Sequence, residues 1–142
     1  MQPFQTDSCN LTPIQILSFQ APGADVERII AAVTALTPLS IGAYDGCAWI
    51  SAPGTERYRP RPGAASGPEE TPRLRPGVVE VTFELPDDAG LATRVVEAIF
   101  QSHSYHEPVI RLISGLGSRS KGLDDRANPN RWWNTTGDWK TA

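Results

Sequence analysis

The chain has 142 residues, about the length of one domain, so we expect a single core with appendages. Its 13 basic and 16 acidic residues give a net charge of −3, which is too mild to predict a nucleic-acid partner or an anionic membrane surface. No segment has the roughly 18–20 apolar residues of a membrane helix. The first ten residues lack the basic start and apolar stretch of a secretory signal. We therefore expect a cytoplasmic protein, with Cys9 and Cys47 as free thiols.

The first half of the chain is predicted to form a strand, a helix and a second strand. Residues 14–20 carry apolar side chains among polar ones and end at an Ala-Pro-Gly turn, which favours a strand. From Asp25, apolar side chains recur at helical spacing until Pro38 ends the pattern. The aromatic segment 41–50 contains two glycines, so we expect a strand with a bulge or a close backbone approach.

The second half repeats this order after a long loop. Residues 52–77 are rich in proline, glycine and arginine and show no period, so they are predicted to be that loop. Strict alternation over 78–85 predicts a third strand, an apolar stripe over 91–100 predicts a second helix, and 109–113 predicts a fourth strand. This order indicates an α+β, ferredoxin-like βαββαβ sandwich with both helices on one sheet face. The other face needs loops, the tail or another subunit to cover it.

The pattern divides the chain into an N-terminal arm, a central domain and a C-terminal tail, at 1–13, 14–114 and 115–142. The tail holds three of the four tryptophans, which are Trp132, Trp133 and Trp139. Because tryptophan buries a large area, we expect the tail to dock on the core or on a neighbouring subunit. The alternative is that Arg131 lines a ligand pocket together with Trp132 and Trp133.

Two motifs resemble a known family. Residues 41–49 (IGAYDGCAW) and 53–60 (PGTERYRP) resemble the first motif of the YqfO-like, PII-like domain, and residues 103–108 (HSYHEP) resemble its second motif, H-P-Y-E-E-P. That domain also occurs inside larger proteins described as type 2 GTP-cyclohydrolase-like, with a dinuclear metal centre in another domain. The match covers about residues 14–113. The departures from the motifs lie at Ala43, Glu56, Ser104 and His106, where the family has Asn, Gly, Pro and Glu.

The resemblance implies a ferredoxin-like subunit related to nitrogen-regulatory PII and CutA proteins. It also implies a homo-oligomer, a trimer rather than a dimer, that binds a small ligand. The metal-dependent hydrolase chemistry of the larger proteins is not implied, because the domain that holds their dinuclear site has no counterpart here. We predict no cofactor.

Three functions remain open from the residues. The first is a non-catalytic, possibly regulatory ligand-binding oligomer. The second is a small enzyme in which Asp45, His103, His106 and Glu107 act as acid and base groups, since histidine titrates near neutral pH. The third is a CutA-like metal-binding protein that uses both histidines and Glu107, which is a weak signal at this spacing.

The side chains expected around a ligand come from the two motifs and the tail. Alternate arginines on an extended segment project the same way and can clamp a carboxylate or phosphate. The expected ligand-binding residues are Tyr44, Asp45, Cys47, Trp49, Arg57, Arg59, Tyr105, Arg131, Trp132 and Trp133.

Overall fold

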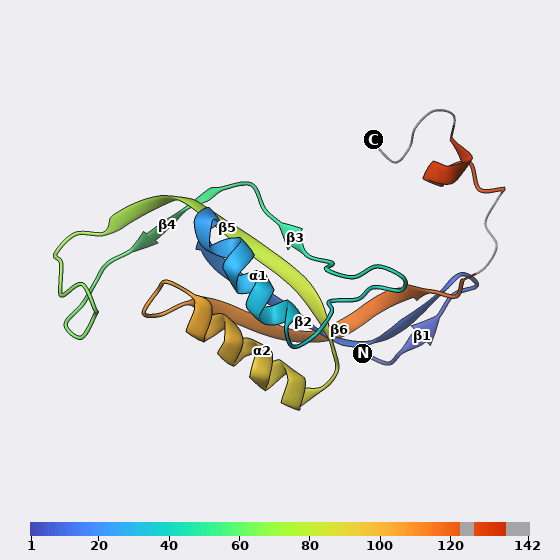
Figure 1. Cartoon of the computed structure of the whole chain (residues 1–142), viewed down its shortest axis with the longest axis horizontal. Helices are drawn as coiled ribbons and strands as arrows, with labels where there is room; N and C mark the ends of the chain where they lie inside the picture. The colour runs from blue at the N-terminus through green and yellow to red at the C-terminus, as the bar shows by residue number, and fades with distance from the viewer. Residues whose placement is uncertain (123–126, 136–142) are drawn as a thin grey trace.

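The computed structural model describes residues 1–122 and 127–135. Two helices lie against one face of an antiparallel sheet, which confirms the predicted ferredoxin-like α+β fold (Figure 1). The elements in chain order are β1 (Phe4–Gln5), β2 (Cys9–Pro22), the 3-10 turn η1 (Gly23–Asp25), α1 (Val26–Thr34), β3 (Trp49–Ile50), β4 (Gly54–Tyr58), β5 (Arg73–Pro86), α2 (Ala89–Ser102), β6 (Val109–Ser120) and the 3-10 turn η2 (Trp132–Asn134).

Strand β2 is the centre of the sheet. It pairs with β6 on one side and with β5 and β1 on the other, and both β3 and β4 pair with the outer edge of β5. All of these pairs are antiparallel, and Leu17 of β2 lies between Leu112 of β6 and Phe83 of β5. The second strand of the ferredoxin pattern is therefore divided into two short pieces, β3 and β4.

The core lies between this sheet and the two helices. Alternate side chains of β2 and β5 point towards the helices, and the rings of Phe19 and Phe83 meet edge to face with centroids 6.5 Å apart. Helix α2 begins where Oδ1 of Asp88 accepts a hydrogen bond of 3.1 Å from the backbone N–H of Leu91. The fully buried large side chains are Leu17, Phe19, Ile29, Val33, Leu39, Val81, Leu85, Val95 and Ile99.

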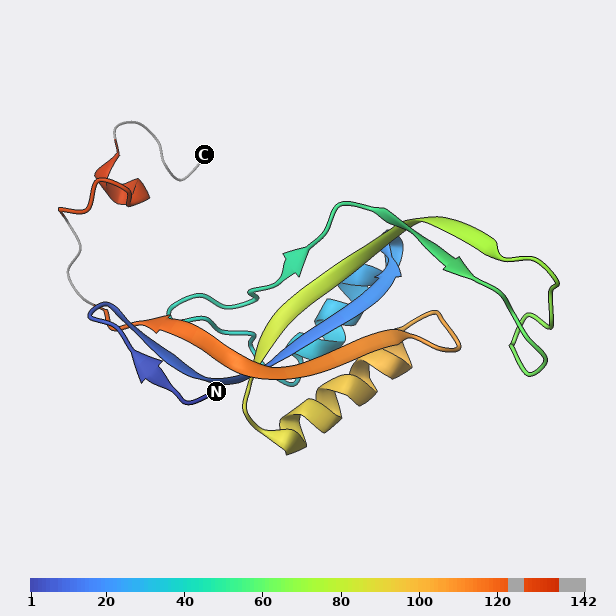
Figure 2. The ribbon, with the colours of Figure 1, turned by 180° about the vertical axis from the view of Figure 1, so that it is seen from behind.

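Two predicted elements of the central region are wrong. Residues 41–48 are turns rather than strand, because Ile41 and Tyr44 exchange backbone hydrogen bonds across a tight turn. The predicted loop 52–77 contains β4 and the first residues of β5, which form a hairpin (Figure 2). Most positions of that hairpin carry polar or exposed side chains. It therefore lacks the alternation of apolar and polar residues from which a strand is predicted.

The other predicted elements are confirmed but have different ends. Strand β2 begins at Cys9 and β6 continues to Ser120, so the paired strands extend well beyond the predicted 14–20 and 109–113. Helix α1 ends at Thr34, and Leu36, which the helical stripe included, is exposed. The division at 1–13, 14–114 and 115–142 stays a prediction.

The sheet face opposite the helices, here called the open face, carries exposed apolar side chains. The register places Trp49 beside Thr82, and Trp49 is 63% exposed. Ile113 of β6 is 61% exposed. Trp132 and Trp133 in η2 are also more than half exposed, so the core of the same chain does not bury them. Trp139 lies outside the described residues. Docking of the tail on a neighbouring subunit stays a prediction.

Both cysteines are free thiols. Among the described residues, no helix is long and apolar enough to cross a membrane.

Candidate functional site

Polar side chains gather in two places. The first, here called the hairpin base, comprises Tyr58, Arg75, His103 and Tyr105, where the β4–β5 hairpin meets the loop after α2. The second is a cavity at the other end of α1, here called the edge cavity, between the loop after that helix, residues 12–14 of β2 and the last residues of β5 and β6.

At the hairpin base, one arginine is held between two tyrosine rings. The guanidinium carbon of Arg75 lies 5.2 Å from the ring centroid of Tyr58 and 4.7 Å from that of Tyr105, both within the range of cation–π attraction. Arg75 Nη2 also donates a 2.9 Å hydrogen bond to the hydroxyl of Tyr58. Burial raises the pKa of Tyr105 above its ordinary value, although the positive charge of Arg75 opposes that change. These contacts tie the hairpin to the body of the domain.

The hydrogen bonds of His103 fix its tautomer. Its Nδ1 accepts a 3.0 Å hydrogen bond from the backbone N–H of Tyr105, so the proton of the neutral ring is on Nε2, which donates to the carbonyl oxygen of Gln20 at 2.7 Å. The ring is 9% exposed and lies against the ring of Tyr105, with centroids 4.7 Å apart. Neither nitrogen is left for a metal or a substrate, so His103 has a structural role in this arrangement.

A buried carboxylate joins the two helices beside the hairpin base. The hydroxyl of Ser104 donates to Asp25, and Arg28 Nη2 lies 3.0 Å from Oδ1 of the same carboxylate. Arg28 also donates from Nε to the carbonyl of Ser102 at 2.9 Å. Burial alone would raise the pKa of Asp25, but the hydrogen bonds from Ser104 and Arg28 and the charge of Arg28 outweigh it, and the net pKa is lowered.

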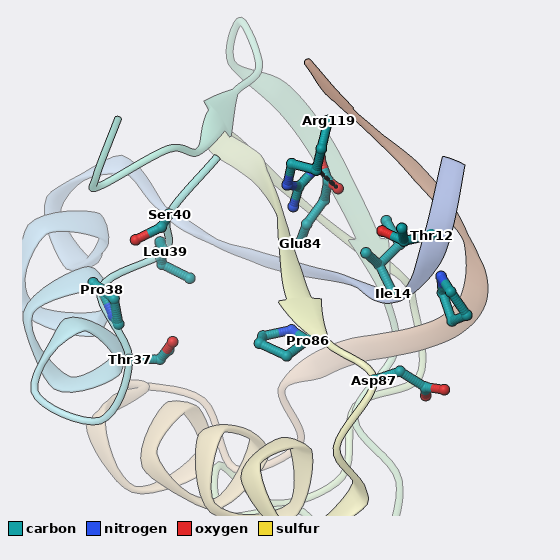
Figure 3. Close-up of a pocket in the computed structure, with 11 residues that line it drawn as sticks. Thr12, Ile14, Thr37, Pro38, Leu39, Ser40, Glu84, Pro86, Asp87 and Arg119 are labelled. Carbon is teal, nitrogen blue, oxygen red and sulfur yellow. Dashed lines mark hydrogen bonds and ion pairs between the residues drawn. The ribbon is translucent and has the colours of Figure 1, made fainter. Parts of the chain in front are cut away.

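The edge cavity has a volume of about 370 Å³ (Figure 3). At one end Arg119 Nη1 donates to Glu84 Oε1 at 3.1 Å, and each of these two side chains keeps about a quarter of its surface exposed. The residues that line the cavity are Thr12, Pro13, Ile14, Thr37, Pro38, Leu39, Ser40, Glu84, Pro86, Asp87 and Arg119.

Two backbone features shape the edge cavity. A Cβ at Gly117 would overlap Oε1 of Glu84 and would lie 2.9 Å from Cδ1 of Ile14, so a larger residue there would have to displace the ends of both side chains. On the opposite wall, Leu39 has φ +53°, the left-handed region that bulky residues rarely adopt. Its side chain is 2% exposed, so burial in the core holds the strained turn in place.

The edge cavity also contains an unpartnered hydroxyl. Thr37 is 7% exposed, and its side chain makes no hydrogen bond to any residue in the described ranges. Figure 3 shows this hydroxyl turned towards Pro86, into the cavity. The hydroxyl oxygen is accessible from the cavity rather than sealed in the core, so it can donate to or accept from a water or ligand atom there.

The first motif lies beside the edge cavity. Oδ1 of Asp45 accepts a hydrogen bond from the hydroxyl of Ser40, which lines the cavity. The thiol of Cys47 donates to the carbonyl of Tyr44 at 3.4 Å, and the Tyr44 side chain is exposed. Of these residues, Asp45 is linked to the cavity through Ser40, while Cys47 closes the turn.

The remaining predicted site residues are spread over the surface. Arg57 and Arg59 are exposed on the hairpin and form no ion pair with a carboxylate in the described part of the chain. Trp49 is on the open face, and Tyr105 is in the hairpin base. Arg131, with Trp132 and Trp133, lies in the exposed segment around η2.

The proposed acid and base groups do not meet within one chain. Asp45 follows the end of α1, whereas His103 lies next to Ser104, which contacts Asp25 at the start of that helix. His106 and Glu107 are exposed in the loop before β6. Within residues 1–122 and 127–135, no group of three or more His, Cys, Asp or Glu side chains could hold a metal ion.

Sequence reasoning missed Thr37, Glu84 and Arg119 as site residues. The one available signal was the pair Gly115 and Gly117 in an otherwise strand-forming segment, which is typical of a close approach by other groups. The partners of that approach come from other strands, so the glycines alone could not identify them.

The fold and its register define an α+β protein of the ferredoxin-like class. No family model and no curated protein matches the chain. Among solved structures, a Bacillus cereus protein related to NIF3 is 20% identical with a TM-score of 0.59, and the match covers 82% of this chain but only 29% of that one. The divalent ion tolerance protein CutA1 from Ehrlichia chaffeensis is 19% identical with a TM-score of 0.51, covering 79% of this chain and 85% of that one.

A third solved structure is the apo form of CPII, a nitrogen regulatory PII-like protein from Thiomonas intermedia K12. It is 14% identical with a TM-score of 0.46, and the match covers 78% of this chain and 98% of that one. The likeness to CutA1 and to part of the NIF3-related protein shows the ferredoxin-like fold.

Proposed function

We propose that this chain is a PII-like, cytoplasmic homo-oligomer of the YqfO-like kind that binds a small molecule in the edge cavity without transforming it. The observation that carries the proposal is the cavity itself. Its volume of about 370 Å³ falls within the roughly 300–1,000 Å³ of ligand pockets. Its wall contains an arginine–glutamate pair and the unpartnered hydroxyl of Thr37. The other lining residues divide about equally between polar and apolar side chains, so the cavity offers both hydrogen-bonding groups and apolar surface.

The open face supports an oligomer. Trp49 and Ile113 expose most of their apolar surface there, which costs free energy in water and favours a covering surface. Part of the tail, residues 115–142, docks on a neighbouring subunit in this proposal, because Trp132 and Trp133 are exposed in the single chain. The resemblance to PII-like domains favours a trimer.

The separation of the candidate acid and base groups supports binding without catalysis. Asp45 and His103 lie at opposite ends of α1, and both nitrogens of His103 are already hydrogen-bonded. The enzyme alternative would need a second chain to bring such groups together.

Native mass spectrometry on protein purified without chelator tests the assembly. We expect a trimer with a stoichiometric small-molecule adduct. Thr12→Trp, which fills the edge cavity from an exposed position on β2, should remove the adduct. Thr71→Trp, an exposed position in the hairpin loop, is the matched control and should keep it. A monomer, or an adduct that both variants retain equally, would contradict the proposal.

A further inference from the structure

We infer that the edge cavity selects small zwitterionic amino carboxylates, with the carboxylate on Arg119 and the ammonium group on Glu84. The inference rests on the proposed function, because it assigns a chemical class to the ligand of the same cavity. Three observations support it: the unused edge of one guanidinium, the unused oxygen of the adjacent carboxylate, and the free hydroxyl across the cavity from them.

Arg119 has a free edge for a carboxylate. Its Nη1 donates to Glu84 Oε1 at 3.1 Å and to the carbonyl of Ser118 at 2.8 Å. Nε and Nη2 have no partner among the described residues. These two nitrogens form the side of the guanidinium that makes two parallel hydrogen bonds to a carboxylate. Figure 3 shows this guanidinium at the cavity wall, beside Glu84. The intramolecular bonds to Glu84 and Ser118 hold the group in position before a ligand arrives.

The carboxylate of Glu84 favours a zwitterionic ligand over a purely anionic one. Its Oε1 accepts from Arg119, while Oε2 has no partner in the described part of the chain. A phosphate or dicarboxylate bound to Arg119 would place a second negative charge next to the Glu84 carboxylate. Two like charges in contact repel strongly where water is partly excluded. An ammonium group beside the ligand carboxylate reverses the sign of that interaction and gives Oε2 a charged donor.

Thr37 provides the third contact. Thr37 is 7% exposed, and its hydroxyl is turned into the cavity with no hydrogen-bond partner among the described residues. A hydroxyl can donate to a ligand carboxylate or accept from an ammonium or side-chain donor. A ligand that spans from Arg119 to Thr37 therefore gains a hydrogen bond to a hydroxyl that no described residue uses.

Isothermal titration of the full-length protein with the twenty amino acids, one at a time, tests the class. We expect at least one to bind. Analogues of that amino acid that lack the ammonium or the carboxylate should bind at least tenfold more weakly. Arg119→Met should abolish binding, and Glu84→Gln should weaken the amino acid tenfold or more while leaving the analogue without the ammonium unaffected. Arg94→Met, at an exposed position on α2, should change nothing.

Binding of the carboxylate-only analogue as tightly as the amino acid, or unchanged binding in Glu84→Gln, would overturn the inference. If a variant does not fold, amide chemical shifts of the unmodified protein give the answer, since the amides of Thr37 and Gly117 report on the cavity. Shifts caused by another class of small molecule but by no amino acid would overturn this inference and leave the proposed function standing. No shift with any class, amino acids included, would overturn both.

Discussion

Gly117→Ala is the sharpest test of how the edge cavity is built. The new methyl group would overlap Oε1 of Glu84 and lie 2.9 Å from Cδ1 of Ile14, a side chain that is 5% exposed. Such overpacking typically costs about 1–3 kcal/mol. Displacing Glu84 also weakens its partly exposed pair with Arg119, and surface pairs of this kind are worth about 0.2–1 kcal/mol.

Alanine also has a favourable effect in a strand, because it loses less backbone entropy than glycine, by about 0.5–1 kcal/mol. We therefore expect Gly117→Ala to lower the free energy of unfolding by about 1–2 kcal/mol. For a chain of this length, such a loss lowers Tm by roughly 3–8 °C. Urea unfolding followed by circular dichroism measures the change.

Two further variants make the reasoning refutable. Gly54→Ala is the matched control, since a Cβ there has its nearest neighbour at an ordinary 3.8 Å, and it should be neutral or slightly stabilising. Ile14→Val removes the Cδ1 that crowds the new methyl, so it should cost about 0.5–1.5 kcal/mol alone and much less in the Gly117→Ala background. Equal stability of Gly117→Ala and Gly54→Ala would show that Glu84 and Ile14 do not lie over Gly117.

Three other predictions follow from the contacts at the helix ends and the hairpin. Arg75→Met removes cation–π contacts with Tyr58 and Tyr105, each worth about 0.5–1 kcal/mol at exposed sites, so hydrogen exchange should accelerate in β4 but not in β2. Because the pKa of Asp25 is lowered by folding, its ionised form stabilises the protein above the ordinary value of 3.8 and this contribution is lost as pH falls through the lower folded pKa. In Asp25→Asn, the urea concentration at half-unfolding should therefore fall less steeply than in the unmodified protein as pH is lowered below 3.8. Asp88→Ala removes the N-cap of α2 and should cost about 1 kcal/mol in thermal unfolding, and no change would contradict the cap.

The sequence was most informative where one face of an element is buried. Alternation over 78–85 and the helical stripe over 91–100 identified β5 and α2 because those elements bury one face in the core. The sequence was least informative where both faces of a strand are exposed to solvent. The β4–β5 hairpin and the outer halves of β2 and β6 have mostly exposed or half-buried side chains, so backbone pairing and polar side-chain contacts form them without an apolar pattern.

The candidate site was predicted only in part for a related reason. Asp45 was singled out from a local motif, and it does lie one hydrogen bond from the edge cavity through Ser40. The pair of Glu84 and Arg119 joins residues 35 positions apart on strands that are not neighbours in the sheet. His103 looked like a catalytic group because histidine titrates near neutral pH. Only the structure shows that two backbone groups occupy its nitrogens.

The wrong strand prediction and the edge cavity have one cause. In the described structure β3 pairs with β5 only at Val81 and Thr82, so no strand covers the outer edge of β5 from Phe83 to Pro86. The loop after α1 takes that place, and it does so through the left-handed turn at Leu39, whose carbonyl accepts from the backbone N–H of Cys47 at 2.9 Å. A regular strand along this edge would place backbone where the cavity now lies. Residues 37–40 of the loop line the cavity, and Asp45 in the following turn accepts a hydrogen bond from Ser40, so the turn that replaces the predicted strand supports the cavity wall.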